Sequence, residues 1–308
     1  MRFAIVSDIH ANMQAWTAVL RDISSNRVDG IICLGDVVGY GPNPLEALQS
    51  VQRHVDTLLL GNHDAALCGK LDPVLFNSRA RAALDWTRTT LAEQANEFLA
   101  ASPLVHVGYG FRCTHGEFSS PAAFRYIITA AEALPSWQAT SEPLLFVGHT
   151  HLPGIFIIGA SGTPHLIPPQ DFMLETGKRY LINVGSVGFP RDNDPRACYV
   201  IYDTTEQSIL WRRIPFDIAA YRQALVAAGL PPTSGSFRDH DPLATRSPIH
   251  TQLDFQPAAR PGLASRAALL MAKMNAPQLI RVHRRKLPLL LLLLQTLLRN
   301  AADRAFTG

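Results

Sequence analysis

A chain of 308 residues with 47% hydrophobic and 17% charged residues is long enough to bury a core and too apolar to be disordered throughout. None of its four cysteines belongs to a Cys-x-x-Cys pair, which is typical of free thiols in a reducing compartment and predicts a cytoplasmic protein. The first residues, Met-Arg-Phe-Ala-Ile-Val-Ser-Asp, indicate a strand and not a signal peptide, and no apolar run reaches the ~18 residues that span a bilayer.

The net charge of +3 is unevenly distributed. Residues 238–308 contain eleven basic and four acidic residues, a balance of +7, which leaves −4 for residues 1–237. The mildly acidic body therefore offers no clear track for a nucleic acid, and a small substrate is expected instead.

Strands and helices alternate in the first hundred residues. The sequence predicts buried strands at residues 3–6, 30–34 and 57–60. It predicts helices at residues 13–25, 44–53 and 78–100. Asn12 is the expected cap of the first helix, and Pro44 suits the first position of the second. This rhythm indicates a mainly parallel sheet.

The second half is richer in strands. A hairpin is predicted at residues 104–108 and 111–114, followed by a helix at 121–133. Further strands are predicted at residues 144–147, 154–158, 180–184, 197–202 and 208–214. A helix over 217–228 ends at Gly229, a good C-terminal cap. The pattern predicts a second sheet packed on the first and a catalytic domain over 1–230, with 231–308 as an extension.

Polar side chains gather where five of the predicted strands end. They are Asp8 and His10, then Asp36, then Asn62, His63 and Asp64, then His115, and finally His149 and His151. Because the carboxyl ends of strands in an α/β sheet meet in one crevice, these groups can converge in space. Carboxylate, amide and imidazole ligands without a thiolate suit Mn, Fe, Zn, Co or Ni. Two such ions about 3.5–4 Å apart would promote displacement at phosphorus.

Each of these pieces alone is weak evidence. An aspartate at a strand end is often only a helix cap, and a lone histidine is more often a core or surface residue than a ligand. That plainer interpretation is kept for the six other histidines, which are His54, His106, His165, His240, His250 and His283. The ordered combination of five pieces, each at a strand end, is what carries the hypothesis.

The same five segments resemble the signature blocks of the calcineurin-like metallophosphoesterase superfamily. The blocks read Asp8-Ile9-His10, Gly35-Asp36-Val37-Val38-Gly39, Gly61-Asn62-His63-Asp64, Thr114-His115-Gly116 and Gly148-His149-Thr150-His151. The segments 183–188 and 194–196 resemble later parts of its small bacterial phosphodiesterase-like branch. The resemblance covers about residues 1–230 and implies a four-layer α/β/β/α sandwich of two mixed sheets.

The resemblance also implies a dinuclear site, with Mn as the first expectation. One ion would be held by Asp8, His10 and His151. A second would be held by Asn62, His115 and His149, with Asp36 bridging both. A hydroxide between the ions would attack phosphorus, His63 would protonate the leaving oxygen, and Asp64 would orient that imidazole.

Some residues depart from the family pattern. The second and third blocks lack the arginines that grip a phosphomonoester in protein phosphatases, which favours phosphodiesters or small nucleotides as substrates. Glu117, where a small residue is expected, is interpreted as a solvated loop residue. Tyr40 and Phe118 either stack on a base or ring of the substrate or take part in ordinary loop packing.

Two alternatives to a phosphodiesterase stay open. The first is a catalytically silent interaction protein on the same fold, which should have lost ligands or the acid histidine. All seven ligand positions and His63 are filled here, which favours an enzyme. The second is a nuclease of the same superfamily, for which the acidic body offers no obvious track.

The C-terminal extension resembles no known family. Residues 231–261 are rich in Pro, Arg, Ser and His and indicate a linker, and 262–275 have helical spacing. The basic residues 281–286 then precede a leucine-rich stretch. Three roles compete for this extension. It packs on the catalytic domain or on a second copy, it attaches to a membrane surface through 278–306, or it is partly disordered.

Overall fold

The computed structural model describes residues 1–91 and 93–230, and their strands form two mixed sheets of six. In the first sheet the order is β3-β2-β1-β11-β12-β9. Its parallel strands are β1 (Arg2–Val6), β2 (Gly30–Cys33) and β3 (Thr57–Leu58). Its antiparallel strands are β11 (Ala197–Asp203), β12 (Ser208–Ile214) and β9 (Phe172–Met173).

The second sheet has the order β4-β5-β6-β10-β7-β8. Parallel neighbours in it are β5 (Phe111–Thr114), β6 (Leu144–Val147) and β10 (Arg179–Asn183). The antiparallel additions are β4 (Val105–Val107), β7 (Gly154–Ile158) and β8 (Pro164–Ile167). The expected pair of mixed sheets is therefore confirmed.

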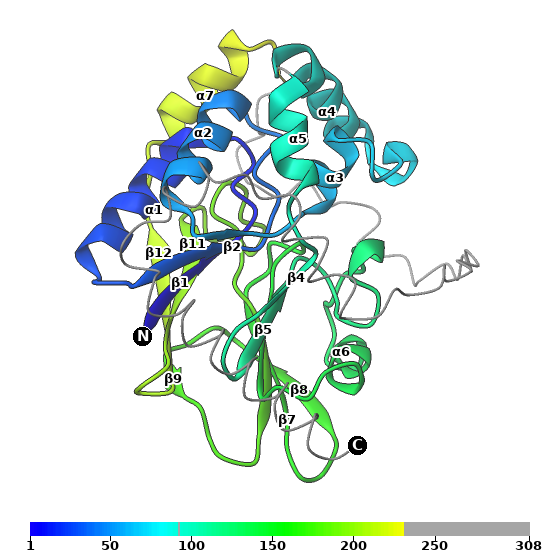
Figure 1. The fold of residues 1–308 in the computed structure, drawn as a ribbon. Helices are drawn as coiled ribbons and strands as arrows, with labels where there is room; N and C mark the ends of the chain where they lie inside the picture. The colour runs from blue at the N-terminus through cyan, green and yellow to red at the C-terminus, as the bar shows by residue number, and fades with distance from the viewer. Residues whose placement is uncertain (92, 231–308) are drawn as a thin grey trace, which may run out of the picture. The chain divides into compact units, whose positions relative to one another are not determined.

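Helices cover the outer face of each sheet unequally. The first sheet carries α1 (Met13–Ser25), α2 (Pro44–His54), α3 (Asn62–Leu67), α4 (Ser78–Thr90), α5 (Glu93–Ala100) and α7 (Ile218–Ala227). Figure 1 shows these helices gathered on one side of the strands β1, β2 and β11. Among the residues that the structure describes, the second sheet carries only α6 (Leu134–Gln138) beside short 3-10 turns. The sandwich of four layers thus has one thick and one thin helical layer.

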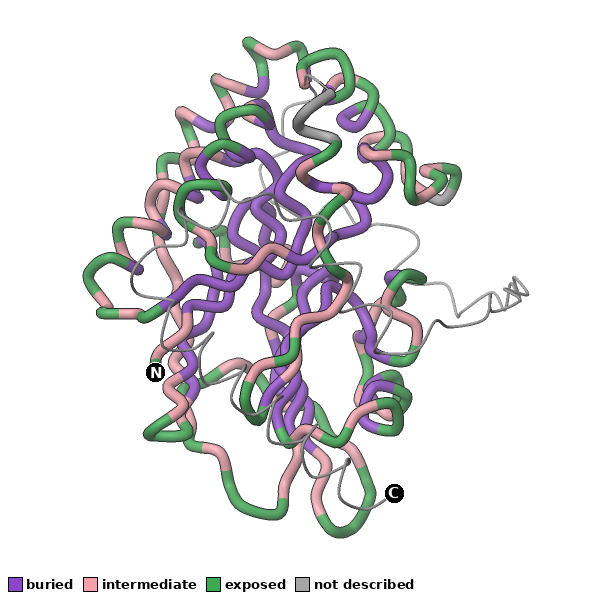
Figure 2. Tube along the Cα trace, in the orientation of Figure 1, coloured by how far each residue is buried: buried purple, intermediate pink, exposed green. Residues whose placement is uncertain are grey.

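Alternation of side chains along the strands builds three separate apolar layers. Ala4 and Val6 face α1 and α2, whereas Ile5 between them points at the other sheet. In β6, Phe146 likewise joins the core between the sheets while Leu145 packs outward against α6. Because successive side chains of a strand point to opposite faces, buried strands of this kind need apolar residues at every position. Figure 2 shows buried residues in the middle of the described part, where strands such as β6 and β11 lie, whereas β8, β9 and β12 are mostly half-buried or exposed.

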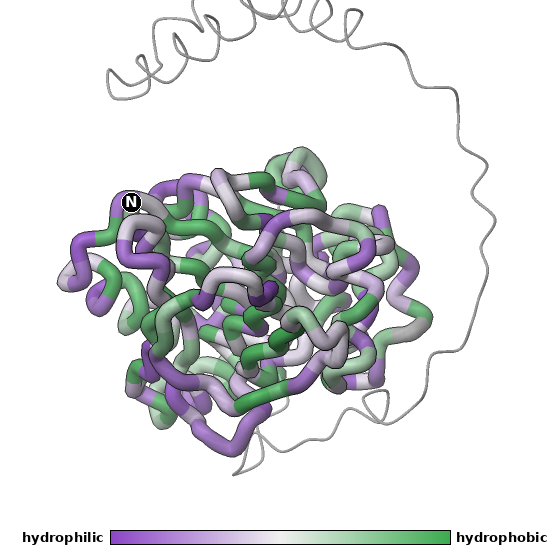
Figure 3. Tube along the Cα trace, turned by 90° about the horizontal axis from the view of Figure 1, so that it is seen from below, coloured by the Kyte–Doolittle hydropathy of each residue, from purple (hydrophilic) through white to green (hydrophobic). Residues whose placement is uncertain are grey.

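The polar and apolar segments separate accordingly. Seen from below, hydrophobic segments run through the middle of the described part, and hydrophilic ones occupy several outer turns (Figure 3). All four cysteines are free, as expected. Within residues 1–91 and 93–230, no helix is long and apolar enough to cross a bilayer.

Several local predictions are confirmed. Asn12 caps α1 by accepting a hydrogen bond from the backbone of Ala15, and Pro44 is the first residue of α2. Asp217 caps α7, and Gly229 follows this helix with a φ of +69°. The extension 231–308, with its predicted linker, helix and leucine-rich stretch, lies outside the described residues.

The predicted helix over 78–100 is wrong in its continuity. The structure has two helices, α4 and α5, separated at Leu91, whose backbone is extended. The hydroxyls of Thr89 and Thr90 both donate to the carbonyl of Trp86. Such side-chain bonds compete with the helical backbone ladder and favour its termination.

The predicted helix over 121–133 is also wrong. A 3-10 turn at Pro121–Ala123 ends at Phe124, which has a left-handed φ of 47°. The chain then runs without a helix to a second 3-10 turn at Ala131–Ala133. Burial of Phe124 next to His115 outweighs local helix propensity here.

Candidate metal centre

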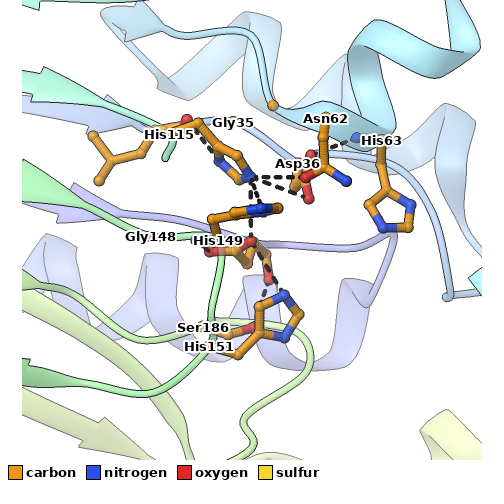
Figure 4. A network of polar contacts seen from close by, with 12 residues as sticks. Gly35, Asp36, Asn62, His63, His115, Gly148, His149, His151 and Ser186 are labelled. Atoms are coloured by element: carbon orange, nitrogen blue, oxygen red, sulfur yellow. Dashed lines mark hydrogen bonds and ion pairs between the residues drawn. The ribbon is translucent and has the colours of Figure 1, made fainter. Parts of the chain in front are cut away.

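The structure brings all nine predicted site residues to one place between the two sheets. Asp8 and His10 follow β1, and Asp36 follows β2. His115 follows β5 in the other sheet, and His149 and His151 follow β6. Asn62, His63 and Asp64 do not end a strand but form the first turn of α3, a helix that was not predicted. Figure 4 shows His115, His149 and Asn62 turned toward Asp36.

The backbone at these positions is unusual. Five of the seven predicted ligands have a positive φ, namely Asp8, His10, Asp36, His149 and His151, with values from 49° to 69°. For residues with a Cβ this left-handed region is sparsely populated, and such residues cluster at functional sites. The surrounding structure therefore holds these side chains in orientations that relaxed strands would not give.

His10 and His151 form the first group of candidate ligands with Asp8. Each ring donates its Nδ1 proton to a main-chain carbonyl, His10 to Val38 at 2.9 Å and His151 to Phe189 at 2.5 Å. A neutral imidazole with its proton on Nδ1 has a bare lone pair on Nε2. The two Nε2 atoms nevertheless lie only 3.1 Å apart.

The carboxylate of Asp8 adds a third acceptor to this group. Its Oδ1 is buried, has no hydrogen-bond partner among the described residues, and lies 3.2 Å from Nε2 of His151. Three buried acceptors that face one another repel, and a bound cation removes that cost. Two imidazole nitrogens bonded to one ion at ~2.1 Å would lie roughly 3.0–3.4 Å apart, which fits the observed pair. The residues present therefore fit a metal ion.

The second group surrounds His115. Its Nε2 lies 3.1 Å from Oδ1 of Asn62 and 3.1 Å from Nδ1 of His149. Its Nδ1 donates to the carbonyl of Leu34 at 3.1 Å, so this ring is oriented by the main chain as His10 and His151 are. The second group thus repeats the chemistry of the first with an amide oxygen in addition.

Asp36 connects the two groups. One oxygen, Oδ2, lies 3.3 Å from Nε2 of His115 and 3.7 Å from Nε2 of His10. The other, Oδ1, accepts the backbone N–H of His63 at 2.8 Å. The carboxylate is therefore held by the backbone with one oxygen between the two histidine groups, which is the arrangement of a bridging ligand.

Burial and charge set the ionisation of these groups. Burial lowers the pKa of His10, His149 and His151 well below the ordinary value, which leaves three neutral imidazoles. For His115, burial acts downward, but the carboxylates of Asp36 and Asp8 outweigh it and raise the pKa to about 9. A proton on His115 therefore balances the acidic groups until a cation replaces it.

His63 lies at the edge of this centre. Its ring is buried, and its centroid is 4.9 Å from the ring of His10 and 4.8 Å from that of Tyr40. Its Nδ1 has no hydrogen-bond partner among the described residues. By distance alone it could also join His10 and Asp36 in holding an ion, since their ligand atoms lie within 4.8 Å of one another. Burial lowers the pKa of His63.

Asp64 does not orient the imidazole of His63 as expected. Its carboxylate accepts backbone N–H groups of Val37 at 3.0 Å and Val38 at 3.2 Å, and it also accepts that of Gly61 at 3.3 Å. Val37 and Val38 belong to the loop after β2 and Gly61 directly precedes α3, so backbone donors from two segments occupy this carboxylate. Asp64 therefore fixes the loop that carries Asp36, and it places His63 only through the chain.

A segment that sequence reasoning left without a role supports the first block directly. Ser186 donates its hydroxyl to the carbonyl of Asp8 at 2.9 Å, and the backbone of Gly188 donates to the same oxygen. The amide of Asn183 donates to the carbonyl of Gly148 at 2.8 Å. The resemblance of 183–188 to a family segment was the available signal, but its function could not be read from residue types.

Sequence reasoning also missed an arginine. The second and third blocks contain none, yet Arg191 reaches the centre from the loop after β10. Its backbone N–H donates to the carbonyl of His151, and its side chain donates to the hydroxyl of Tyr40 at 3.3 Å. The second and third blocks do lack arginines, but a guanidinium still reaches this site because Arg191 arrives from a distant segment.

Three further expectations are settled by burial. Glu117 is not solvated but only 3% exposed, and it accepts bonds from Ser119, Ser120 and Arg125. The segment 117–125 is thereby folded into a compact loop.

Tyr40 and Phe118 are buried as well, which supports loop packing over stacking on a substrate. The ring of Tyr40 stacks on Phe189 at 5.0 Å, and Phe118 belongs to the core beside α6. Tyr126, which is less buried, stacks on His149 with centroids 4.2 Å apart.

Comparison with known proteins identifies the family. The calcineurin-like phosphoesterase superfamily domain matches residues 1–207. The chain belongs to this superfamily. It is accordingly a phosphoesterase hydrolase of a family that uses divalent metal ions, and the resemblance found in the five sequence blocks is confirmed.

Two curated proteins show how far this similarity extends. An uncharacterized protein of Methanocaldococcus jannaschii is 33% identical over 235 residues, which are 74% of this chain and 93% of that protein. A symmetrical bis(5′-nucleosyl)-tetraphosphatase of Neisseria gonorrhoeae is 34% identical over 98 residues, but these are only 27% of this chain and 36% of that enzyme.

Solved structures give the same fold. A metallophosphoesterase from Sphaerobacter thermophilus is 37% identical with a TM-score of 0.66, covering 75% of this chain and 95% of that one. A hypothetical protein from Pyrococcus horikoshii OT3, 19% identical with a TM-score of 0.60 over 75% of this chain and 94% of that one, shares the fold alone.

Proposed function

We propose that this protein hydrolyses phosphodiesters or small nucleotides at a dinuclear metal centre. The observation that carries the proposal is the convergence of buried acceptors with no proton between them, above all the Nε2 atoms of His10 and His151 and Oδ1 of Asp8. Main-chain carbonyls hold the imidazoles in this tautomer, as they do for metal ligands in general. A purely structural cluster has no reason to aim lone pairs at one another.

The ligands divide into two sets that share one residue. Asp8, His10 and His151 would hold one ion, and Asn62, His115 and His149 the other. Asp36 would contact both through Oδ2. When bound, two such ions would activate the attacking water and neutralise negative charge that develops at phosphorus. The nitrogen and oxygen donor set suits Mn first, with Fe, Zn, Co and Ni as further candidates.

The chain itself supplies orientation and a proton. His63 would donate its proton to the leaving oxygen, because it lies beside the ligand Asn62 without being needed for either set. Asp64 would keep the loop of Asp36 in place through the bonds that it accepts from Val37 and Val38. General acid assistance of this kind is typically worth about 10²–10⁴-fold in rate.

The substrate class rests on weaker support. The partial similarity to a bis(5′-nucleosyl)-tetraphosphatase favours small nucleotides. The lack of arginines in the second and third blocks favoured diesters over monoesters, but Arg191 weakens that argument. A silent interaction protein and a nuclease are the competing functions, and a filled ligand set with His63 in place disfavours the first.

A substrate panel with purified protein tests the proposal. With added Mn, we expect turnover of bis(p-nitrophenyl) phosphate, and we would compare it with p-nitrophenyl phosphate, cyclic nucleotides, dinucleoside polyphosphates and DNA. Asp36→Asn is the inactive reference, and Asp56→Asn, an exposed acid outside the site, is the matched control. Failure to hydrolyse any of these substrates at saturating Mn, with metal bound, would favour the silent protein instead.

A further inference from the structure

Beside the candidate ligands lies a group of side chains that the proposed mechanism does not use. The rings of Tyr40 and Phe189 stack on each other with centroids 5.0 Å apart. The guanidinium carbon of Arg191 lies 6.0 Å from the first ring and 5.7 Å from the second. We call Tyr40, Phe189 and Arg191 the arginine–aromatic cluster.

The cluster borders the centre beside His63, His10 and His151. The ring of Tyr40 is 4.8 Å from that of His63 and 4.8 Å from that of His10. The guanidinium of Arg191 is bonded to the hydroxyl of Tyr40 at 3.3 Å, so it lies about one ring farther out than these imidazoles. A guanidinium is not a metal ligand, but from this position its positive charge acts on His63 and His151.

The loop that carries Arg191 is fixed in this position. Its backbone N–H donates to the carbonyl of His151, which ties the loop to a candidate ligand. The next acid, Asp192, forms an ion pair with Arg213 of β12, and Asp194 pairs with Arg196 at 2.7 Å. The first of these ion pairs ties the loop that carries Arg191 to β12.

A second guanidinium approaches the same cluster. Arg79, in the first turn of α4, lies with its guanidinium carbon 5.1 Å from the ring of Phe189. Two arginines from segments more than a hundred residues apart thus meet at one aromatic ring beside the centre. The planar guanidinium offers paired donors that match phosphate oxygens, so this is a favourable place for an anion.

We propose that Arg191 determines substrate specificity by binding a phosphate carried by the leaving group, so that this site prefers substrates with a phosphoanhydride bond over simple diesters. The inference rests on the proposed function, because it places the scissile phosphate at the dinuclear centre and the leaving oxygen at His63. Hydrolysis adds water across the scissile P–O bond, the leaving phosphate departs with the bridging oxygen, and Arg191 holds that phosphate before and after cleavage.

The test compares two substrates with the same scissile adenylate phosphorus. Diadenosine diphosphate releases AMP, a leaving group with a phosphate, whereas the p-nitrophenyl ester of AMP releases an aryl alcohol without one. For Arg191→Gln we expect kcat/KM to fall about 10- to 100-fold more on diadenosine diphosphate than on the aryl ester. Arg191→Lys should recover only part of this, since a lysine lacks the paired donors.

The matched control is Arg196→Gln, in the same loop. Arg196 is exposed and pairs with Asp194, so its loss removes the same charge without touching the cluster. We expect Arg196→Gln to keep the native ratio between kcat/KM on diadenosine diphosphate and kcat/KM on the aryl ester. Arg79→Gln should shift the ratio in the same direction as Arg191→Gln but by less.

The outcomes separate this inference from the proposed function. Suppose that the native protein hydrolyses the aryl ester and that Arg191→Gln lowers kcat/KM by the same factor on both substrates. Arg191 is then structural, and the inference fails while the proposed function stands. The inference also fails if diadenosine diphosphate is not hydrolysed. If neither substrate nor bis(p-nitrophenyl) phosphate is hydrolysed by the Mn-loaded protein, the proposed function itself fails.

Discussion

Buried acceptors that face one another are the residue-level signature of this site. In a folded protein such groups are normally paired with donors, because an unpaired buried polar atom costs about 1–3 kcal/mol. Here Asp8, His10 and His151 direct an oxygen and two nitrogens at a common point. A bound cation removes this cost, so the arrangement itself indicates that these residues are metal ligands.

Asp36 is the residue on which both sets depend. We expect Asp36→Asn to lower kcat/KM on bis(p-nitrophenyl) phosphate by about 10³-fold or more, because the common anionic ligand is lost. The amide oxygen of Asn can still accept the backbone N–H of His63, so the fold should persist.

The measurement is steady-state turnover together with metal content by elemental analysis. Asp56→Asn is the matched control, since Asp56 also accepts a backbone N–H, that of Ile31, but lies outside the centre. Full activity of Asp36→Asn, or two ions retained with native affinity, would contradict a bridging role.

His63 tests the proposed general acid. We expect His63→Ala to lower kcat by about 10²–10⁴-fold on a diester with a high-pKa leaving group, and by much less on a p-nitrophenyl ester. A good leaving group departs without a proton, so only the first substrate needs the imidazole. Bound metal should stay unchanged. Equal losses on both substrates, or loss of an ion, would make His63 a phosphate or metal ligand.

The order of residue types along the chain predicted which side chains come together, but not the role of each side chain in the site. Six of the nine residues converge because they follow the carboxyl ends of β1, β2, β5 and β6, whereas Asn62, His63 and Asp64 come from the first turn of α3. Asp64 was misjudged because a carboxylate can serve an imidazole or backbone amides equally well. Glu117 and Arg191 could not be judged from the sequence, since their partners come from the folded path of loops.

At the level of elements, loops and not strands carry the functional geometry. The segment 183–191 binds the carbonyl of Asp8 through Ser186 and Gly188 and then delivers Arg191. Most strand positions were predictable because buried strands are continuous apolar runs, whereas β8 and β9, which are half-buried or exposed, were not predicted. The helix breaks at Leu91 and Phe124 were not, because they depend on a threonine pair and on burial beside His115.

One ion pair joins α1 to β12 and can be tested through pH. Arg212 donates to both oxygens of Asp22, at 2.6 and 2.9 Å, and Tyr199 donates to one of them at 2.7 Å. Burial alone would raise the pKa of Asp22, but these hydrogen bonds outweigh it and the pKa is lowered. A carboxyl with a lowered pKa stabilises the fold above its unfolded pKa, and this stabilisation is lost as pH falls through the folded pKa.

We therefore expect Asp22→Asn to reduce the free energy of unfolding at pH 7 by about 1 kcal/mol, a value discounted for the partial exposure of the pair. The difference between the two proteins should shrink as pH falls below about 4. Urea unfolding at several pH values measures it. Asp85→Asn, which breaks an exposed pair with Arg88, should have little effect at any pH. A difference that stays constant down to pH 2 would argue against the charge as its cause.

For the whole molecule, the proposed metal centre would also be a stabilising element. It joins loops from both sheets, so an ion that binds the folded state alone adds about 2.7 kcal/mol at a concentration of 100 Kd. In a domain of this size we expect Mn added to chelator-treated protein to raise Tm by roughly 5–10 °C. Asp36→Asn should show less than half of this shift, and Asp56→Asn all of it. An unchanged Tm at saturating Mn would mean that the loops are equally stable without metal.

The last prediction is that residues 231–308 are dispensable for chemistry. All nine candidate site residues lie within 8–151, and the described core closes at Leu230, which is 5% exposed and packs on Tyr221 and Leu225 of α7. A chain that ends at Leu230 should therefore keep its fold, its Mn content and most of its kcat/KM on bis(p-nitrophenyl) phosphate. A chain that ends at Asp217 is the matched comparison, because it also loses α7 and these buried side chains and should have a lower Tm. If the chain that ends at Leu230 is less soluble than the full chain, the prediction still stands, because solubility does not measure catalysis. Loss of turnover in a folded, metal-loaded protein ending at Leu230 would show that the extension takes part in catalysis.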